Sequence, residues 1–80
     1  MNIRKGDVWY FARIIPRNSI YEVCELKIRT ITEDYIVGID KHDKHAYLIN
    51  NLEIPKLLFK NRKDALSKVK LAEKGDDYIV

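Results

Sequence analysis

The residues best suited to chemistry in this sequence are Asp40, His42, Asp43 and His45, which fall within six positions. Imidazole and carboxylate groups are ligands that zinc and similar metals accept in proteins. Their spacing matches no known closed ligand set, and polar side chains at a hairpin tip point in diverging directions. We therefore predict a solvated turn here and no metal site.

Cys24 is the only cysteine, so no disulfide can form within the chain and no cysteine-rich metal site can be built. It stands between Val23 and Glu25 in a strand-like run. A reactive thiol needs a nearby cationic partner, and the sequence around it supplies none. We predict a buried, structural thiol.

Other catalytic sets are missing. Neither serine, Ser19 or Ser67, lies in a nucleophile elbow. Each of the three glycines is isolated, so there is no Gly-rich loop to cradle a phosphate. The acidic pairs at positions 33–34 and 76–77 fall where turns are expected. We expect a non-enzymatic protein without a cofactor.

Length and charge set further bounds. A chain of 80 residues forms one domain, and 46% hydrophobic with 34% charged residues is the balance of a folded protein. A net charge of +3 allows contact with a polyanion without requiring it. The first residues lack the apolar stretch of a signal peptide, and no run approaches the length of a membrane span. We expect a cytoplasmic protein that does not enter a membrane.

The strand signals come first along the chain. Val8–Ile15 is β-branched and aromatic, and it ends at Pro16, which cannot donate to a ladder. Further strands are expected over residues 20–32, 35–41, 45–49 and 57–59. The apolar phase of the second strand changes around Val23 and Cys24, which predicts a bulge or a sharp bend there. Gly38, in mid-strand, predicts a bend or a close approach of backbone.

A single helix follows the last strand. Asn61 is a good N-cap, Asp64 adds negative charge to the first turn, and Gly75 is the expected stop. The helix should cover residues 61–74, with a short tail at 76–80. A stripe at helical spacing should face the core. Its members are Ala65, Leu66, Val69 and Ala72.

Five short strands followed by one helix, without β-α-β alternation, predict a mainly β fold. The expected architecture is a five-stranded antiparallel small barrel capped by the C-terminal helix. Residues 1–75 should form this single domain. Leu58 and Phe59 should face the barrel interior, next to the helix that covers it.

The chain resembles a widespread group of small, uncharacterised proteins of Firmicutes phages and prophages. Residues 6–10, Gly-Asp-Val-Trp-Tyr, match the opening strand of that group, and Phe59 to Ala65 match its closing strand and helix start. Lys63 and Asp64 replace the usual acidic pair. The resemblance implies an SH3-like barrel with a C-terminal helix. It also implies a mobile-element setting, in which the partner could be a host or defence protein such as a CRISPR nuclease, bound as an inhibitor.

Aromatic and cationic side chains alternate along the strands and suit contact with a macromolecule. We favour a protein partner, which open strand edges and aromatic anchors can recruit. The alternative is nucleic acid, which aromatic platforms beside cations can bind. A homodimer is compatible with either hypothesis. The candidate contacts are Trp9, Phe11, Arg13, Arg17, Tyr21, Arg29 and Tyr35.

Overall fold

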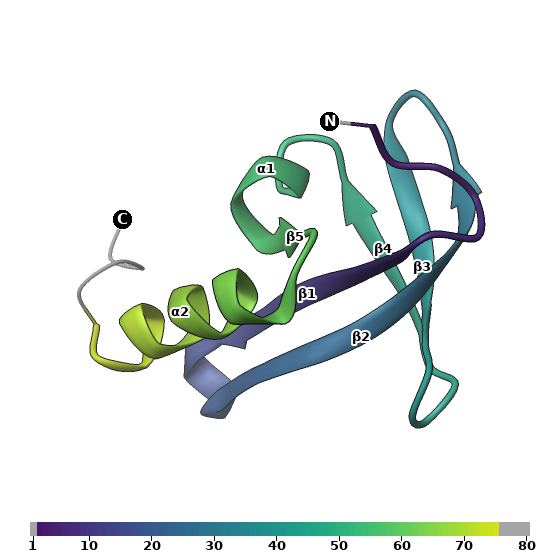
Figure 1. Ribbon diagram of the computed structural model, residues 1–80. Helices are drawn as coiled ribbons and strands as arrows, with labels where there is room; N and C mark the ends of the chain where they lie inside the picture. The colour runs from purple at the N-terminus through teal and green to yellow at the C-terminus, as the bar shows by residue number, and fades with distance from the viewer. Residues whose placement is uncertain (1, 76–80) are drawn as a thin grey trace.

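A computed structural model describes residues 2–75 as one antiparallel sheet with a helix at its C-terminal end (Figure 1). The strands are β1 (Val8–Ile15), β2 (Ile20–Ile31), β3 (Tyr35–Asp40), β4 (Ala46–Asn50) and β5 (Leu58–Phe59). The helices are the 3-10 turn η1 (Pro16–Asn18), α1 (Ile54–Leu57) and α2 (Arg62–Glu73). The mainly β, antiparallel prediction is confirmed. The expected tail at 76–80 lies outside the described residues.

Within residues 2–75 the sheet is open and does not close into a hydrogen-bonded barrel. Its strand order is β4-β3-β2-β1-β5, so β4 and β5 are the two edges. Side chains draw β4 toward β1, since the ring of Tyr47 lies 5.7 Å from that of Phe11. The guanidinium carbon of Arg13 lies 5.3 Å from the centroid of the same tyrosine ring. The sheet is therefore curled by side-chain packing while its backbone edges stay separate.

One face of the sheet builds the main core. Alternate residues of a strand point to the same face, so each strand contributes every second side chain. Ile54 of α1 and Leu58 of β5 pack over the same cluster. The buried strand residues of this cluster are Trp9, Cys24, Leu26, Ile28, Ile36 and Ile49.

Helix α2 covers the opposite face of β1 and β2. Val69 and Ala72 pack there with Ala12 and Ile14 of β1, in a second buried cluster. The predicted N-cap is confirmed, because Asn61 Oδ1 accepts the backbone N–H of Asp64 at 3.0 Å.

Leu66 does not join the helix stripe that the sequence predicted. The buried residues of α2 are Ala65, Val69 and Ala72, whereas Leu66 is 40% exposed. At about 100° per residue, Leu66 lies a quarter turn away from this narrow stripe. Two alanines let the helix sit close to the sheet, and only a narrow stripe is then covered.

The bulge in β2 lies further along than the sequence predicted. β1 pairs with β2 regularly through Cys24 and Val23, and the register with β3 shifts between Ile28 and Thr30. The change of apolar phase has another cause. Cys24 faces the main core, while Val23 packs in the cluster beneath α2, so both faces of β2 are covered at this point.

The segment before α2 is more helical than expected. Residues 54–57 form the single turn α1, with Pro55 in its first turn, and β5 keeps only Leu58 and Phe59 of the predicted strand 57–59. Proline suits the first turn of a helix because its missing N–H would have no partner there. Leu58 is fully buried, but Phe59 is only half-buried. The interior position predicted for both residues is therefore found for Leu58, while Phe59 packs on the α2 side.

Candidate functional site

β2 is much longer than its neighbour β3, so part of the β2 edge on the β3 side is left unpaired. β1 pairs with β2 from Ile20 to Lys27, but β3 pairs only from Leu26 onward. No strand among residues 2–75 covers the β3 side of residues 20–25. In Figure 1 this stretch is the lower edge of β2, running free from η1 toward the β3–β4 hairpin.

The backbone orientation shows which groups this free edge presents. Lys41 N–H donates to the carbonyl of Glu25 at 2.9 Å, so Glu25 points its carbonyl to the β3 side. Successive residues of a strand direct their backbone groups to opposite edges. Tyr21 and Val23 therefore turn an N–H and a C=O to the same open side. We call residues 20–25 of β2 the free edge.

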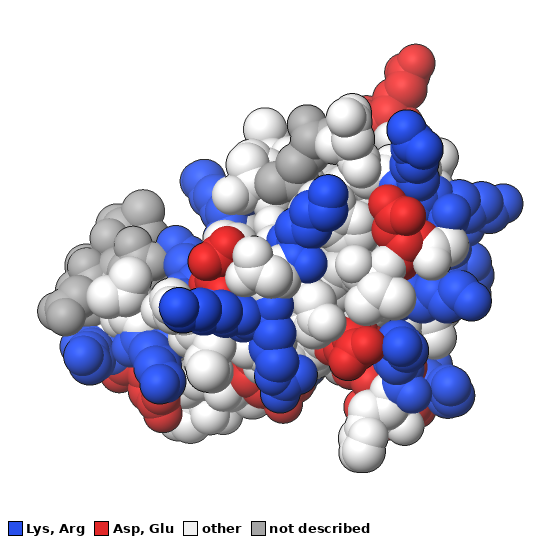
Figure 2. Space-filling view, in the orientation of Figure 1, with Lys and Arg blue, Asp and Glu red and all other residues white. Residues whose placement is uncertain are grey.

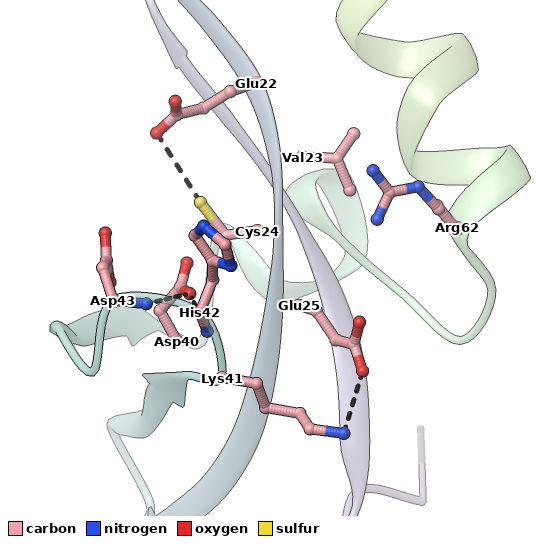
Figure 3. A pocket seen from close by; sticks show the side chains of 9 residues that line it. All are labelled: Glu22, Val23, Cys24, Glu25, Asp40, Lys41, His42, Asp43 and Arg62. Carbon is pink, nitrogen blue, oxygen red and sulfur yellow. Dashed lines mark hydrogen bonds and ion pairs between the residues drawn. The ribbon is translucent and has the colours of Figure 1, made fainter.

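A hollow of about 540 Å³ lies along the free edge (Figure 3). In Figure 3 the side chains of Cys24 and His42 lie on one side of β2, and those of Val23 and Arg62 lie on the other. A strand placed along this edge would send alternate side chains to these two sides. The lining residues are Glu22, Val23, Cys24, Glu25, Asp40, Lys41, His42, Asp43 and Arg62.

The hollow contains both acidic and basic side chains, and their ion pairs are weak. Glu22 Oε2 lies 2.9 Å from Arg13 Nη1, and Glu25 Oε2 lies 3.1 Å from Lys41 Nζ. The bond to Glu22 raises the pKa of Arg13. Exposed ion pairs of this kind contribute about 0–1 kcal/mol, so an incoming partner can replace them at little cost. Arg62 has no ion pair within the described part of the chain.

The side chain of Asp40 organises the hairpin tip. Its side chain is buried, and Oδ1 accepts the backbone N–H of His42 at 2.7 Å and of Asp43 at 3.1 Å. His45 Nδ1 lies 3.1 Å from Asp43 Oδ2, and the pKa of Asp43 is lowered first by the backbone N–H of His45. The solvated turn is confirmed. Within residues 2–75, no group of three or more His, Cys, Asp or Glu side chains is placed to hold a metal ion.

Cys24 is buried, as predicted. Its Sγ lies 3.7 Å from Glu22 Oε2. Burial, followed by the charges of Glu22 and Asp40, raises the pKa of the thiol to about 12. The thiolate is the nucleophilic form of cysteine, so this group is inert near neutral pH.

Three of the predicted aromatic contacts are wholly or partly packed inside. Trp9 is 5% exposed, and its indole N–H donates to Asp7 at 3.5 Å, so it has no surface to present to a macromolecule. Phe11 is half-buried between the two clusters. Tyr21 is half-buried on the side of α2, although its backbone belongs to the free edge.

The remaining four candidates lie apart from one another. Arg13 is tied to Glu22, and Arg17 is exposed in η1. Arg29 is exposed at the register shift of β2, and Tyr35 is half-buried at the start of β3. Of all seven, only Tyr21 belongs to the free edge itself. The sequence did contain a signal for that edge, since the strand expected at 20–32 is far longer than the one at 35–41.

No known family model matches this chain, and no curated protein or solved structure matches it. The similarity to phage proteins therefore stays a prediction. Among residues 2–75, no helix has the length and apolar character needed to cross a membrane.

Proposed function

We propose that this chain is a non-enzymatic binding module that captures a protein partner by adding a partner strand to the free edge of β2. The observation that carries this proposal is the open backbone of Tyr21 and Val23 beside a hollow of about 540 Å³. In strand addition, main-chain hydrogen bonds supply affinity and pockets for alternate side chains supply specificity. The free edge and its hollow provide both.

The partner strand would take the place of an extended β3, in line with the hairpin that begins at Asp40. Its side chains on the Arg62 side should include an acidic residue, because that guanidinium has no ion pair within residues 2–75. Those on the other side would meet Glu22 and the hairpin tip, where a basic or small polar residue fits. An alternating strand of this kind is the partner that we propose.

Apart from its location in the cell, the biological setting comes from the sequence resemblance alone. This resemblance supports a phage or mobile-element origin and an SH3-like small barrel as the interpretation of the curled sheet. Action in the cytoplasm is proposed separately, from the sequence composition. The resemblance also supports a host or defence protein, such as a CRISPR nuclease, as the partner. A second copy of this chain, pairing its own free edge, is the competing occupant.

A matched pair of variants at Val23 tests strand addition. Val23→Pro removes the N–H that faces the free edge, whereas Val23→Ala keeps the N–H and removes two side-chain carbons, so it controls for the loss of the valine side chain. Wild type and each tagged variant are used in pull-downs from host lysate, with and without nuclease treatment. The folding of each protein is checked by circular dichroism, and its mass in solution is measured by light scattering.

The proposal predicts a partner that wild type and Val23→Ala capture and that Val23→Pro loses. Equal capture by both variants would overturn it, as would a partner that disappears after nuclease treatment. A stable dimer that Val23→Pro dissociates would identify a second copy as the occupant and would remove the foreign partner.

A further inference from the structure

A second hollow, of about 590 Å³, is lined mainly by cations. Five of its nine lining residues are Lys or Arg. We call them the basic hollow: Lys5, Lys27, Arg29, Lys41 and Lys44. Among the described lining residues the one carboxylate belongs to Asp40, which is buried and accepts two backbone N–H groups of the hairpin. The described lining therefore has an excess of positively charged side chains.

Backbone structure brings these cations together from three segments. Lys27 pairs with Ile39 across β2 and β3, while Arg29 lies at the register shift. The segment of Lys5 is held against β2, because Gly6 N–H donates to the carbonyl of Ile28 at 2.8 Å. Lys44 belongs to the β3–β4 hairpin. The sheet and its connections therefore fix the positions of the residues that form the basic hollow.

Most of these charges lack a counter-charge of their own. Within residues 2–75, no carboxylate forms an ion pair with Lys5, Lys27, Arg29 or Lys44, whereas Lys41 pairs with Glu25. Figure 2 shows Lys and Arg side chains crowding the side of the molecule where the N-terminal segment and the ends of β2 and β3 lie in Figure 1. Clustered like charges raise the local potential and attract anions.

We propose that the basic hollow binds the sugar–phosphate backbone of a nucleic acid. Regularly spaced phosphates can meet several of these cations at once, and neutralising them releases counterions. None of the residues among 2–75 that line the hollow is aromatic, so this lining offers bases nothing to stack on and we expect no sequence preference. This contact is separate from the free edge, although Lys41 and Asp40 line both hollows.

The test compares two quadruple variants with the same change of net charge. The first carries Lys5→Gln, Lys27→Gln, Arg29→Gln and Lys44→Gln, leaving Lys41 intact. The control carries glutamine at four exposed lysines elsewhere, Lys56, Lys60, Lys63 and Lys70. Fluorescence anisotropy measures binding to a labelled DNA duplex of about 20 base pairs, at about 50 mM and about 200 mM salt. Val23→Pro is measured in the same way.

Four phosphate contacts predict a loss of about 100-fold in affinity between the two salt concentrations for wild type. The first variant should bind at least about 10-fold more weakly and lose most of the salt dependence, while the control and Val23→Pro stay within about 3-fold of wild type. No binding at the lower salt, or an equal loss in the control, would overturn the proposal. It would also fail if a polyglutamate peptide of matched charge competed as well as the duplex, since the hollow would then accept acidic protein.

The same variants separate this inference from the proposed function. The first quadruple variant should still capture the partner that depends on the free edge. Val23→Pro should lose that partner and keep the duplex. Either contact can therefore fail without the other.

Discussion

Leu26 and Gly38 approach each other so closely across β2 and β3 that a Cβ atom on residue 38 would lie 2.9 Å from Leu26 Cβ. Leu26 is fully buried in the main core and cannot move aside freely. Glycine is therefore required at position 38 by the absence of space. The sequence had predicted a bend or a close approach at this glycine, and the close approach is what the structure contains.

Gly38→Ala should destabilise the domain by overpacking, by about 1–3 kcal/mol. Urea unfolding followed by tryptophan fluorescence measures the change, since Trp9 lies in the same core cluster. Val37→Ala, at the preceding position of β3 and on the other face of the sheet, is the control for a general effect of substitution in this strand. A urea midpoint for Gly38→Ala equal to that of wild type would show that the Leu26 side chain can move aside without loss of stability.

Removal of the side chain of Asn61 should weaken the start of α2. The side chain accepts the backbone N–H of Asp64 at 3.0 Å, and loss of such a cap typically costs about 1 kcal/mol. Asn61→Ala is therefore expected to lower the free energy of unfolding by that amount. Asn61→Asp keeps an oxygen acceptor and should leave it nearly unchanged, and equal losses in both variants would argue against the cap.

Asp40→Ala should loosen the β3–β4 hairpin. It leaves the N–H groups of His42 and Asp43 without the acceptor that they share, which should cost about 1–3 kcal/mol. Asp40→Asn retains the Oδ1 acceptor and should lose less. Hydrogen exchange at residues 42 and 43 checks the local effect, and unchanged protection in Asp40→Ala would show that the turn does not depend on this side chain.

In β5, Leu58 should contribute more to the free energy of unfolding than Phe59. Leu58→Ala removes a fully buried side chain and should cost about 2–5 kcal/mol. Phe59 is half-buried, so Phe59→Ala should cost less than the roughly 3–5 kcal/mol expected for a fully buried phenylalanine. Thermal unfolding of the two variants ranks them, and a larger loss for Phe59→Ala would restore the interior position first predicted for its ring.

Local signals predicted the parts of this fold that depend on local chemistry. Pro16 follows the end of β1, Gly75 follows the end of α2, and the Asn61 cap marks where α2 begins. The number and direction of the strands follow from the same alternation and turn signals. These features depend on a few neighbouring residues, which is why the sequence was sufficient for them.

Features that depend on pairing between distant segments were missed. The phase change at Val23 predicts a bulge or bend from the sequence, because the sequence does not show that α2 covers that face. Residue type alone predicts the candidate contacts, and it does not reveal that Trp9 is buried. Nor could it show that Arg29 gathers with Lys5 and Lys44, because that cluster requires three separated segments to meet.

Cys24 should make stability depend on pH under alkaline conditions. Its pKa is raised from 9.0 to about 12, first by burial and then by Glu22 and Asp40, so the folded chain holds the thiol proton more tightly than the unfolded chain. The resulting stability is fully present below about pH 9 and is lost as the pH rises toward 12. Burial raises the pKa of Tyr47 as well, which adds to the loss in the same direction.

Urea unfolding of wild type and Cys24→Ala at about pH 8 and about pH 10.5 isolates the thiol contribution. Cys24→Ala leaves a small cavity at both pH values, so the informative quantity is the change with pH within each protein. Wild type should lose more free energy of unfolding between the two pH values than the variant does. Equal losses would mean that the thiol proton is held no more tightly in the folded chain than in the unfolded one.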